Sequence, residues 1–380
     1  MARPIGRQEL KEFRMRLLLA AIAVCAAALP AYAEDPLLDD AVSFTGQIFH
    51  LDTAVPGLVI AAVRGGESAV FGFGETAKGS GQEPDGDTRI GVGSITKTFT
   101  GLTLAHLAAA GTVDLTDAAG PNVGVVETLP EREHPIRLVD LATHSSGLGR
   151  ELKPVDGAEK YSDASFAGTL GGDPLLFTPG TGILYSNIGF DLLAMALSGA
   201  ADRPYRDLLR ETVLDPLGLD ATGYERPDGD NVMTGYDWNG GEMDPGEPIP
   251  NRFGASALHT TANDMIRYLE WNLDRFGDGM EARTLSHAAY LVRDGLDPVY
   301  GMDESGHMDA MGLGWVVMMP QDDRPLILQK AGGANGVFSY IAFAPTRGVG
   351  VFMSINQFNF SASIAMAEVA NQLIATLAPR

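Results

Sequence analysis

The chain of 380 residues contains one cysteine, Cys25, which excludes an intramolecular disulfide and a zinc site built of several thiolates. This cysteine lies in "MRLLLAAIAVCAAALPAYA", where a basic start and an apolar run precede Ala31-Tyr32-Ala33. That pattern is typical of a signal peptide with its cleavage site. We therefore expect residues 1–33 to be removed after Ala33, leaving a mature protein without cysteine.

Long hydrophobic runs are also missing. The run Leu17–Leu29 is short for a membrane span, and we expect no other span in the chain. An uncleaved anchor remains the alternative to a signal peptide. We expect cleavage, no transmembrane anchor afterwards and, because an exported protein without disulfides is typical of bacteria, a periplasmic location.

Basic residues are scarce: 27 Lys and Arg stand against 49 Asp and Glu, which gives a formal charge of −22. The first 33 residues carry five basic and two acidic side chains, so the mature chain has a charge of −25. Such a surface disfavours nucleic acid and anionic membranes as partners. We expect a monomer that acts on a small-molecule or peptide substrate.

Several catalytic patterns are absent. The seven histidines form no H-E-x-x-H or similar metal spacing, so we expect no metal and no cofactor. No G-x-S-x-G elbow occurs, which disfavours an α/β-hydrolase. His144, in "THSSGL", is interpreted as a hydrogen-bonded structural histidine.

What the chain does contain is the stretch "GVGSITKTFTG", in which Ser94 stands three residues before Lys97 at the start of an apolar, helix-forming run. Residues three apart share one face of a helix, so the hydroxyl and the amine would be neighbours. A hydroxyl beside an amine can act as a nucleophile. Taken alone, this spacing is common, and a capped helix start explains it equally well.

Two further stretches change that balance. "YSN" follows a Pro-Gly turn and precedes an apolar helix, so a short exposed loop would present Tyr185 and Asn187 together. "QKAGGANG" puts Lys330 at the end of an expected strand. The glycines after it would let a substrate approach the backbone closely.

These three motifs, in this order, form the signature of active-site-serine penicillin-recognising enzymes. The tyrosine form of the second motif resembles class C β-lactamases, and residues 301–336 are similar to AmpH-type D-alanyl-D-alanine carboxypeptidase/endopeptidases. The resemblance covers nearly the whole mature chain. It implies the β-lactamase/transpeptidase-like fold, and an enzyme that cleaves peptidoglycan stem peptides at D-alanine and binds β-lactams.

The resemblance also implies roles for individual residues. Ser94 would form an acyl-enzyme, and either Lys97 or Tyr185 would be the general base. Asn187 would hold the lysine and the substrate amide, with Lys330 beside them. The oxyanion hole would consist of the backbone N–H groups of Ser94 and Gly333. The substrate-binding set is Asn187, Lys330, Ala331, Gly332 and Gly333.

One position departs from the family pattern, which has threonine where this chain has Ala331. The missing hydroxyl would normally help to bind the substrate carboxylate, and its loss costs about 1–2 kcal/mol for one hydrogen bond to a charged group. This departure disfavours strong β-lactamase activity and favours a carboxylesterase, since a simple ester needs no carboxylate clamp. A class C-like β-lactamase or a carboxylesterase on the same scaffold is the second enzyme interpretation. A catalytically silent sensor of β-lactams or muropeptides is a third interpretation.

Apolar segments near both ends of the chain indicate strands, and the middle is mainly helical. We expect an α/β (α+β) protein, with an antiparallel sheet flanked by helices plus a helical subdomain. The expected division is a sheet domain of residues 34–111 and 301–380 and a mainly helical insertion, 112–300, that completes the active-site cleft.

Overall fold

The computed structural model describes residues 35–120, 129, 132–172, 175–227, 229–244, 249, 251–303 and 305–378. The expected signal peptide, its cleavage site and Cys25 lie outside these residues. The chain divides into two units, Met1–Pro36 and Leu37–Arg380, and the elements described here belong to the second, except that the first helix begins at Pro36.

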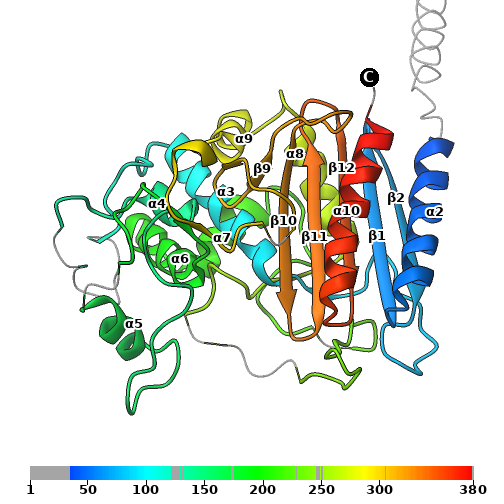
Figure 1. Cartoon of the computed structure of the whole chain (residues 1–380), viewed down its shortest axis with the longest axis horizontal. Coiled ribbons are helices and arrows are strands. Elements are labelled where there is room, and N and C mark those ends of the chain that lie inside the picture. The colour runs from blue at the N-terminus through cyan, green and yellow to red at the C-terminus, as the bar shows by residue number, and fades with distance from the viewer. Residues whose placement is uncertain are drawn as a thin grey trace, which may run out of the picture. The chain divides into compact units, whose positions relative to one another are not determined.

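An eight-stranded antiparallel sheet forms the centre of this unit, in the order β2-β1-β12-β11-β10-β9-β8-β6 (Figure 1). Strands from the two ends of the sequence meet where β1 pairs with β12. The strands are β1 (Gly57–Arg64), β2 (Glu67–Gly74), β6 (Leu291–Val292), β8 (Ala310–Met311), β9 (Val316–Met318), β10 (Ile327–Ala334), β11 (Val337–Ala344) and β12 (Val349–Ile355).

Both faces of the sheet are covered, which explains why its strands read as continuous apolar runs. Alternate residues of a strand point to opposite faces. In β1, Leu58, Ile60 and Ala62 join one apolar core, and Val59, Ala61 and Val63 join the other. The sheet is therefore the middle layer of three, with a separate core on each side.

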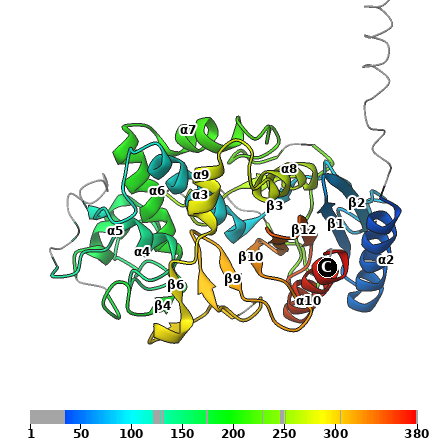
Figure 2. The same cartoon turned by 90° about the horizontal axis from the view of Figure 1, so that it is seen from above.

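Helices α2 (Pro36–Thr53) and α10 (Phe360–Leu377) contribute to the core on one face. Helix α8 (Ala262–Leu273) contributes to the core on the other face, where it contacts β1 and β12 (Figure 2). By length and composition α10 would qualify as a membrane span. Its buried side chains pack against β11 and β12, so it serves as a core helix.

The core that contains α8 continues into the helical part of the chain. Short strands pair there, β3 with β5 and β4 with β7. The remaining elements are β3 (Ile90–Gly91), η1 (Gly93–Ile95), α3 (Thr96–Ala109), α4 (Leu138–Ala142), α5 (Asp163–Leu170), β4 (Ile183–Leu184), α6 (Asn187–Ala201), α7 (Tyr205–Leu209), η3 (Arg210–Leu214), β5 (His259–Thr260), α9 (Met280–His287), η4 (Arg293–Gly295) and β7 (Val299–Tyr300).

The predicted antiparallel sheet flanked by helices is confirmed, together with a helical part. Two local expectations are wrong. Lys330 lies inside β10, since the glycines after it also pair with β11. Tyr185 and Asn187 are buried rather than presented on an exposed loop, because Asn187 is the first residue of α6 and both side chains pack inside the fold.

Candidate functional site

Ser94 lies in the single turn η1, directly before the 14-residue helix α3. Gly93 before it has φ of +51°, a left-handed conformation that glycine adopts at low cost. This turn brings the chain from β3 into the helix and leaves Ser94 half-buried. The serine therefore stands at the positive end of the helix dipole, which favours negative charge developing nearby.

Lys97 follows one turn later and is fully buried. Its Nζ donates to Ser94 Oγ at 3.0 Å, to Asn187 Oδ1 at 2.8 Å and to the Ala255 carbonyl at 2.8 Å. An ammonium has three protons and uses all of them in these contacts. A neutral amine needs only two for Asn187 and Ala255, and its lone pair would then face the serine hydroxyl.

The pKa of Lys97 is lowered to about 8, mainly by burial and in addition by the positive charge of Lys330. Tyr185 and Asp191 oppose this shift because a negative charge on either favours the ammonium. The net shift brings the Lys97 amine close to the pH range in which it can accept a proton.

Tyr185 lies between β4 and α6 and is 8% exposed. Its Oη is 3.5 Å from Lys330 Nζ. The Lys97 and Lys330 amines lie 5.0 and 5.1 Å from its ring centroid. Burial would raise its pKa, but the charges of Lys330 and Lys97 outweigh burial and lower the value to about 7. The phenolate is thus accessible near neutral pH.

His144 stacks on Tyr185 with ring centroids 4.5 Å apart. Its Nδ1 accepts a hydrogen bond from the Ser186 amide at 3.0 Å. Burial and the nearby charges of Lys97 and Lys330 hold its pKa well below the usual value. A neutral ring of this kind orients the tyrosine, in agreement with the structural role predicted for this histidine.

Strand β10 closes the other side of the site. Lys330 is 5% exposed and its Nζ also donates to the carbonyl of Ala331 at 2.8 Å. Gly332 lies against η1: a Cβ atom on it would lie 2.0 Å from Val92 O and 2.9 Å from Ser94 N. Only glycine allows this close approach of the strand, which brings the backbone of β10 beside the Ser94 amide.

The structure thus brings together Ser94, Lys97, Tyr185, Asn187 and Lys330, with Ala331, Gly332 and Gly333 on the adjoining strand. These residues come from three separate segments of the chain. The five side chains supply a hydroxyl, two amines, a phenol and a carboxamide. Backbone amides of the turn and the strand lie beside them. This set can perform nucleophilic acyl transfer without a metal ion.

Sequence reasoning did not identify four polar residues next to this site. Glu151 accepts from Asn187 Nδ2 at 2.5 Å and from the Tyr161 hydroxyl, and it pairs with Arg252 at 3.3 Å. Asp191 accepts from the Ala255 amide at 3.0 Å. Asp191 could have been found because it lies one helical turn after Asn187. The contacts of Glu151 join residues far apart in sequence, so no spacing rule indicated them.

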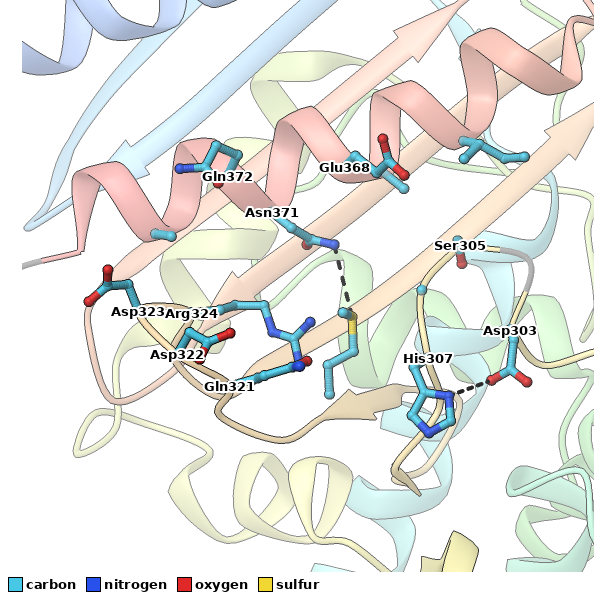
Figure 3. Close-up of a pocket in the computed structure, with 15 residues that line it drawn as sticks. Asp303, Ser305, His307, Gln321, Asp322, Asp323, Arg324, Glu368, Asn371 and Gln372 are labelled. Atoms are coloured by element: carbon cyan, nitrogen blue, oxygen red, sulfur yellow. Dashed lines mark hydrogen bonds and ion pairs between the residues drawn. The ribbon is translucent and has the colours of Figure 1, made fainter.

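A cavity of about 710 Å³ lies elsewhere, between α10 and the segment from Asp303 to Arg324 (Figure 3). Its lining includes Asp303, His307, Arg324 and Glu368. None of the residues gathered around Ser94 lines it. Within the described part of the chain, no group of three or more His, Cys, Asp or Glu side chains could hold a metal ion.

Comparisons with known proteins agree with this geometry. The family model described as "Beta-lactamase" matches residues 33–375. The chain is 31% identical over 382 residues to the D-alanyl-D-alanine-carboxypeptidase/endopeptidase AmpH of Escherichia coli K12, covering 95% of this chain and 97% of AmpH. It is 25% identical to a beta-lactamase of Pseudomonas fluorescens, covering 80% of this chain and 89% of the relative.

Among solved structures, a beta-lactamase/D-alanine carboxypeptidase from Yersinia pestis, complexed with citrate, superposes with a TM-score of 0.79 at 30% identity. The match covers 91% of this chain and 99% of that one. A class C beta-lactamase superposes with a TM-score of 0.77 at 21% identity, covering 92% and 99% of the two chains. The second likeness concerns the fold alone.

Proposed function

This chain belongs to the beta-lactamase family and is a serine hydrolase, and on that premise we propose that it is a D-alanyl-D-alanine carboxypeptidase/endopeptidase acting on peptidoglycan stem peptides. The similarity to AmpH across nearly the full length of both chains supports this substrate class. The observation that carries the proposal is the contact of a fully buried Lys97 amine with Ser94 Oγ at 3.0 Å.

In the proposed acylation step, Ser94 Oγ attacks the carbonyl carbon of the penultimate D-alanine. The serine proton passes to the Lys97 amine or to the Tyr185 phenolate, both of which lie within reach. The carbonyl oxygen becomes an oxyanion, which the backbone N–H groups of Ser94 and Gly333 would stabilise. The C–N bond then breaks, and Tyr185 gives a proton to the leaving amine; where Lys97 took the serine proton, Lys97 passes it on to Tyr185.

Deacylation uses the same groups in the reverse direction. Water enters the space left by the amine, gives a proton to Tyr185 or Lys97 and attacks the ester carbonyl. The Ser94–acyl bond breaks and the serine recovers its proton. In an endopeptidase reaction the leaving amine belongs to a cross-linked peptide instead of a free D-alanine, so one site serves both reactions.

We propose that Lys330 attracts the substrate carboxylate, whether of a terminal D-alanine or of a β-lactam. Since Ala331 offers no hydroxyl, Lys330 acts mainly as a point charge, which provides less directional recognition than a threonine beside it would. This observation favours a second candidate, a carboxylesterase, because a simple ester requires no carboxylate clamp. It counts against strong activity of the other alternative, a class C-like β-lactamase, whose substrate carries a carboxylate.

We also propose a location, an oligomeric state and a division of the chain into parts. Residues 1–33 act as a signal peptide that directs the protein to the periplasm, where its substrate lies, and the mature protein is a monomer without a membrane anchor. Residues 112–300 form the mainly helical insertion that completes the cleft. A hydrogen bond from Lys97 in the proposed sheet domain to Asn187 in the proposed insertion supports this arrangement.

The test is to mix the purified mature protein with excess penicillin and to follow its intact mass over time, with Ser94→Ala as the control. A stable adduct on the wild type alone supports a penicillin-binding peptidase, which is then assayed on D-alanyl-D-alanine muropeptides. A transient adduct with drug hydrolysis favours the β-lactamase.

Two other outcomes decide against the first candidate. If no adduct forms but Ser94-dependent ester hydrolysis is measured, the carboxylesterase is correct. A stable adduct without turnover of any muropeptide or ester indicates the sensor.

A further inference from the structure

Helix α6 carries two polar side chains that approach Lys97. Asn187 and Asp191 are four residues apart and therefore lie on one face of the helix. Asn187 contacts the Lys97 amine directly at 2.8 Å. Asp191 reaches it through a peptide group: its Oδ1 accepts from the Ala255 amide at 3.0 Å, and the Ala255 carbonyl accepts from Lys97 Nζ at 2.8 Å.

Asp191 is fully buried, which is rare for an aspartate. It is 0% exposed, and its second oxygen, Oδ2, has no hydrogen-bond partner among the described residues. A carboxylate that is fully buried and only half satisfied is costly, so stability alone does not account for it. The charged side chains that act on it are Arg252 and Lys97, which favour its ionised form, and Glu151, which opposes it.

Other titratable groups lie close to Asp191 and Lys97 and affect their charges. Burial raises the pKa of Asp191, and the hydroxyls of Tyr205 and Tyr224 lie near enough for its charge to act on them. Around Lys97 the titratable neighbours are Tyr185, Lys330 and His144. Asp191 is the carboxyl group that acts on the charge of Lys97, and Lys330 opposes it.

We propose that Asp191 is a positioning residue for the nucleophile's lysine, acting through the Ala255 peptide. Its hydrogen bond to the Ala255 amide orients that peptide so that the carbonyl points at Lys97 Nζ. The oriented carbonyl and Asn187 Oδ1 together hold the amine beside Ser94. The carboxylate charge also favours the protonated amine, so Asp191 raises the pH above which Lys97 can accept the serine proton, alongside the larger effects of burial, Tyr185 and Lys330.

This inference rests on the proposed function, in which Ser94 is acylated with Lys97 beside it. Two substitutions separate geometry from charge. Asp191→Asn keeps an oxygen that can accept from the Ala255 amide but removes the charge. Asp191→Ala removes both the acceptor and the charge.

Asp264 offers the matched control. It is 1% exposed, lies on α8 and likewise accepts from a backbone amide, that of Ala221 at 2.9 Å. It makes no contact with Lys97 or Ala255. Asp264→Asn therefore repeats the same chemical change in a similarly buried carboxyl group outside the site.

The measurement is the second-order rate of acylation by a fluorescent penicillin, recorded from about pH 5 to pH 9, with the melting temperature of each variant. Loss of a negative charge lowers the pKa of a neighbouring amine, so the acidic limb of the Asp191→Asn profile should move to lower pH by about half a unit or more. The plateau rate should stay within about threefold of wild type.

Asp191→Ala should lose about tenfold or more at the plateau, since the amine loses its oriented third acceptor, while Asp191→Asn restores most of that rate. In Asp264→Asn, the acidic limb of the acylation profile should stay at the same pH as in the wild type. A limb at the wild-type pH in Asp191→Asn, or an equal shift in Asp264→Asn, overturns the inference. So does a loss in Asp191→Ala that follows its melting temperature alone.

Failure of the inference and failure of the proposed function give different results. If the wild type is labelled at Ser94 and both Asp191 variants behave like it, only the inference is wrong. If the wild type and Ser94→Ala are equally unlabelled, the acyl-enzyme proposal and the inference that rests on it are both wrong.

Discussion

The Lys97 amine and the Tyr185 phenol occupy one buried site, and each changes the proton affinity of the other. Burial disfavours the charge on both groups. Two ammonium groups, those of Lys97 and Lys330, favour the phenolate, and a phenolate in turn favours a protonated Lys97. One proton is therefore shared between two groups, which suits a site that must accept a proton from serine and later return it to an amine.

Tyr185→Phe tests the phenol. We expect kcat/KM to fall by about 10²- to 10⁴-fold, the usual contribution of a general acid–base group. In the wild type, the pKa values of Tyr185 and Lys97 are lowered to about 7 and about 8, so the rate should rise with pH through this range as the coupled pair loses its protons. The variant lacks this step, and loss of the phenolate lowers the pKa of Lys97, so its residual rate should rise at a lower pH. A variant within threefold of wild type would contradict the assigned role.

Ala331→Thr tests the departure from the family motif. Ala331 is half-buried and directly follows Lys330 on β10. The resemblance to the family implies that a threonine hydroxyl at this position helps to bind the substrate carboxylate. We expect about a tenfold gain in kcat/KM for penicillin or a D-alanine peptide relative to a neutral ester. Ala331→Val has nearly the same shape without the hydroxyl and is the control. An equal gain in both variants would show that packing, not hydrogen bonding, is responsible.

At the scale of elements, the site depends on how closely strand β10 approaches the turn η1. Ser94 and Gly333 are far apart in sequence, yet the proposed oxyanion hole needs both of their amides. A Cβ atom on Gly93 would lie 2.4 Å from the Gly333 carbonyl oxygen. The contact that packs the strand against the turn therefore also brings the backbone of Gly333 close to the turn that carries Ser94.

A pair of substitutions in β10 tests this contact. A methyl group on Gly332 would meet backbone atoms, with Val92 O at 2.0 Å, whereas one on Gly333 would meet the Phe338 ring at 3.1 Å, which can shift. We expect Gly332→Ala to reduce the acylation rate about 10²-fold or more, the usual cost of a lost oxyanion donor, and to lower the melting temperature. Gly333→Ala should remain close to wild type. Equal rates in the two variants would mean that the strand need not touch the turn.

The division of the chain into a sheet domain and a helical insertion also belongs to this scale, and it stays a prediction. The edge strand β6 comes from the stretch 112–300 and pairs with β8 from the last part of the chain. The core that contains α8 likewise extends from the sheet into α6. Whatever boundary is drawn, the two parts share one continuous apolar core.

At the scale of the whole molecule, the charge of −22 limits the partners of the protein. A substrate with a carboxylate must approach against the field of the whole surface. Cations that oppose this field locally include Lys97 and Lys330, both buried at the site, and Arg150, whose guanidinium carbon lies 4.6 Å from the centroid of the Tyr185 ring. Attraction of an anionic substrate is therefore a short-range property of the cleft, even though the surface as a whole repels anions.

Removal of a signal peptide during export would change the mass and the thiol content of the protein. If residues 1–33 are removed after Ala33, the mature protein starts at Glu34 and contains no cysteine. Protein expressed with its leader and isolated from the periplasm should have the mass of residues 34–380 and give no reaction with a thiol reagent after denaturation. One thiol per chain would mean that the leader is retained, which favours the anchored alternative.

The sequence by itself determined the family, through the resemblance of its three motifs, and also the strands at the two ends and two close pairs of site residues. The strands follow from apolar runs, and the pairs follow from short spacings: three residues between Ser94 and Lys97 and two between Tyr185 and Asn187. Local geometry converts such spacings into neighbours, so no tertiary information is needed.

Only the tertiary structure decided which distant groups complete the site. The Ala255 carbonyl joins Lys97 to Asp191, and Glu151 joins Asn187 to Arg252 across about 100 residues of chain. Tyr185 and Asn187 proved to be buried, and the glycines after Lys330 proved to be strand. Burial and contacts between remote segments arise when helices pack against the sheet, and the same packing desolvates Lys97 and changes its chemistry.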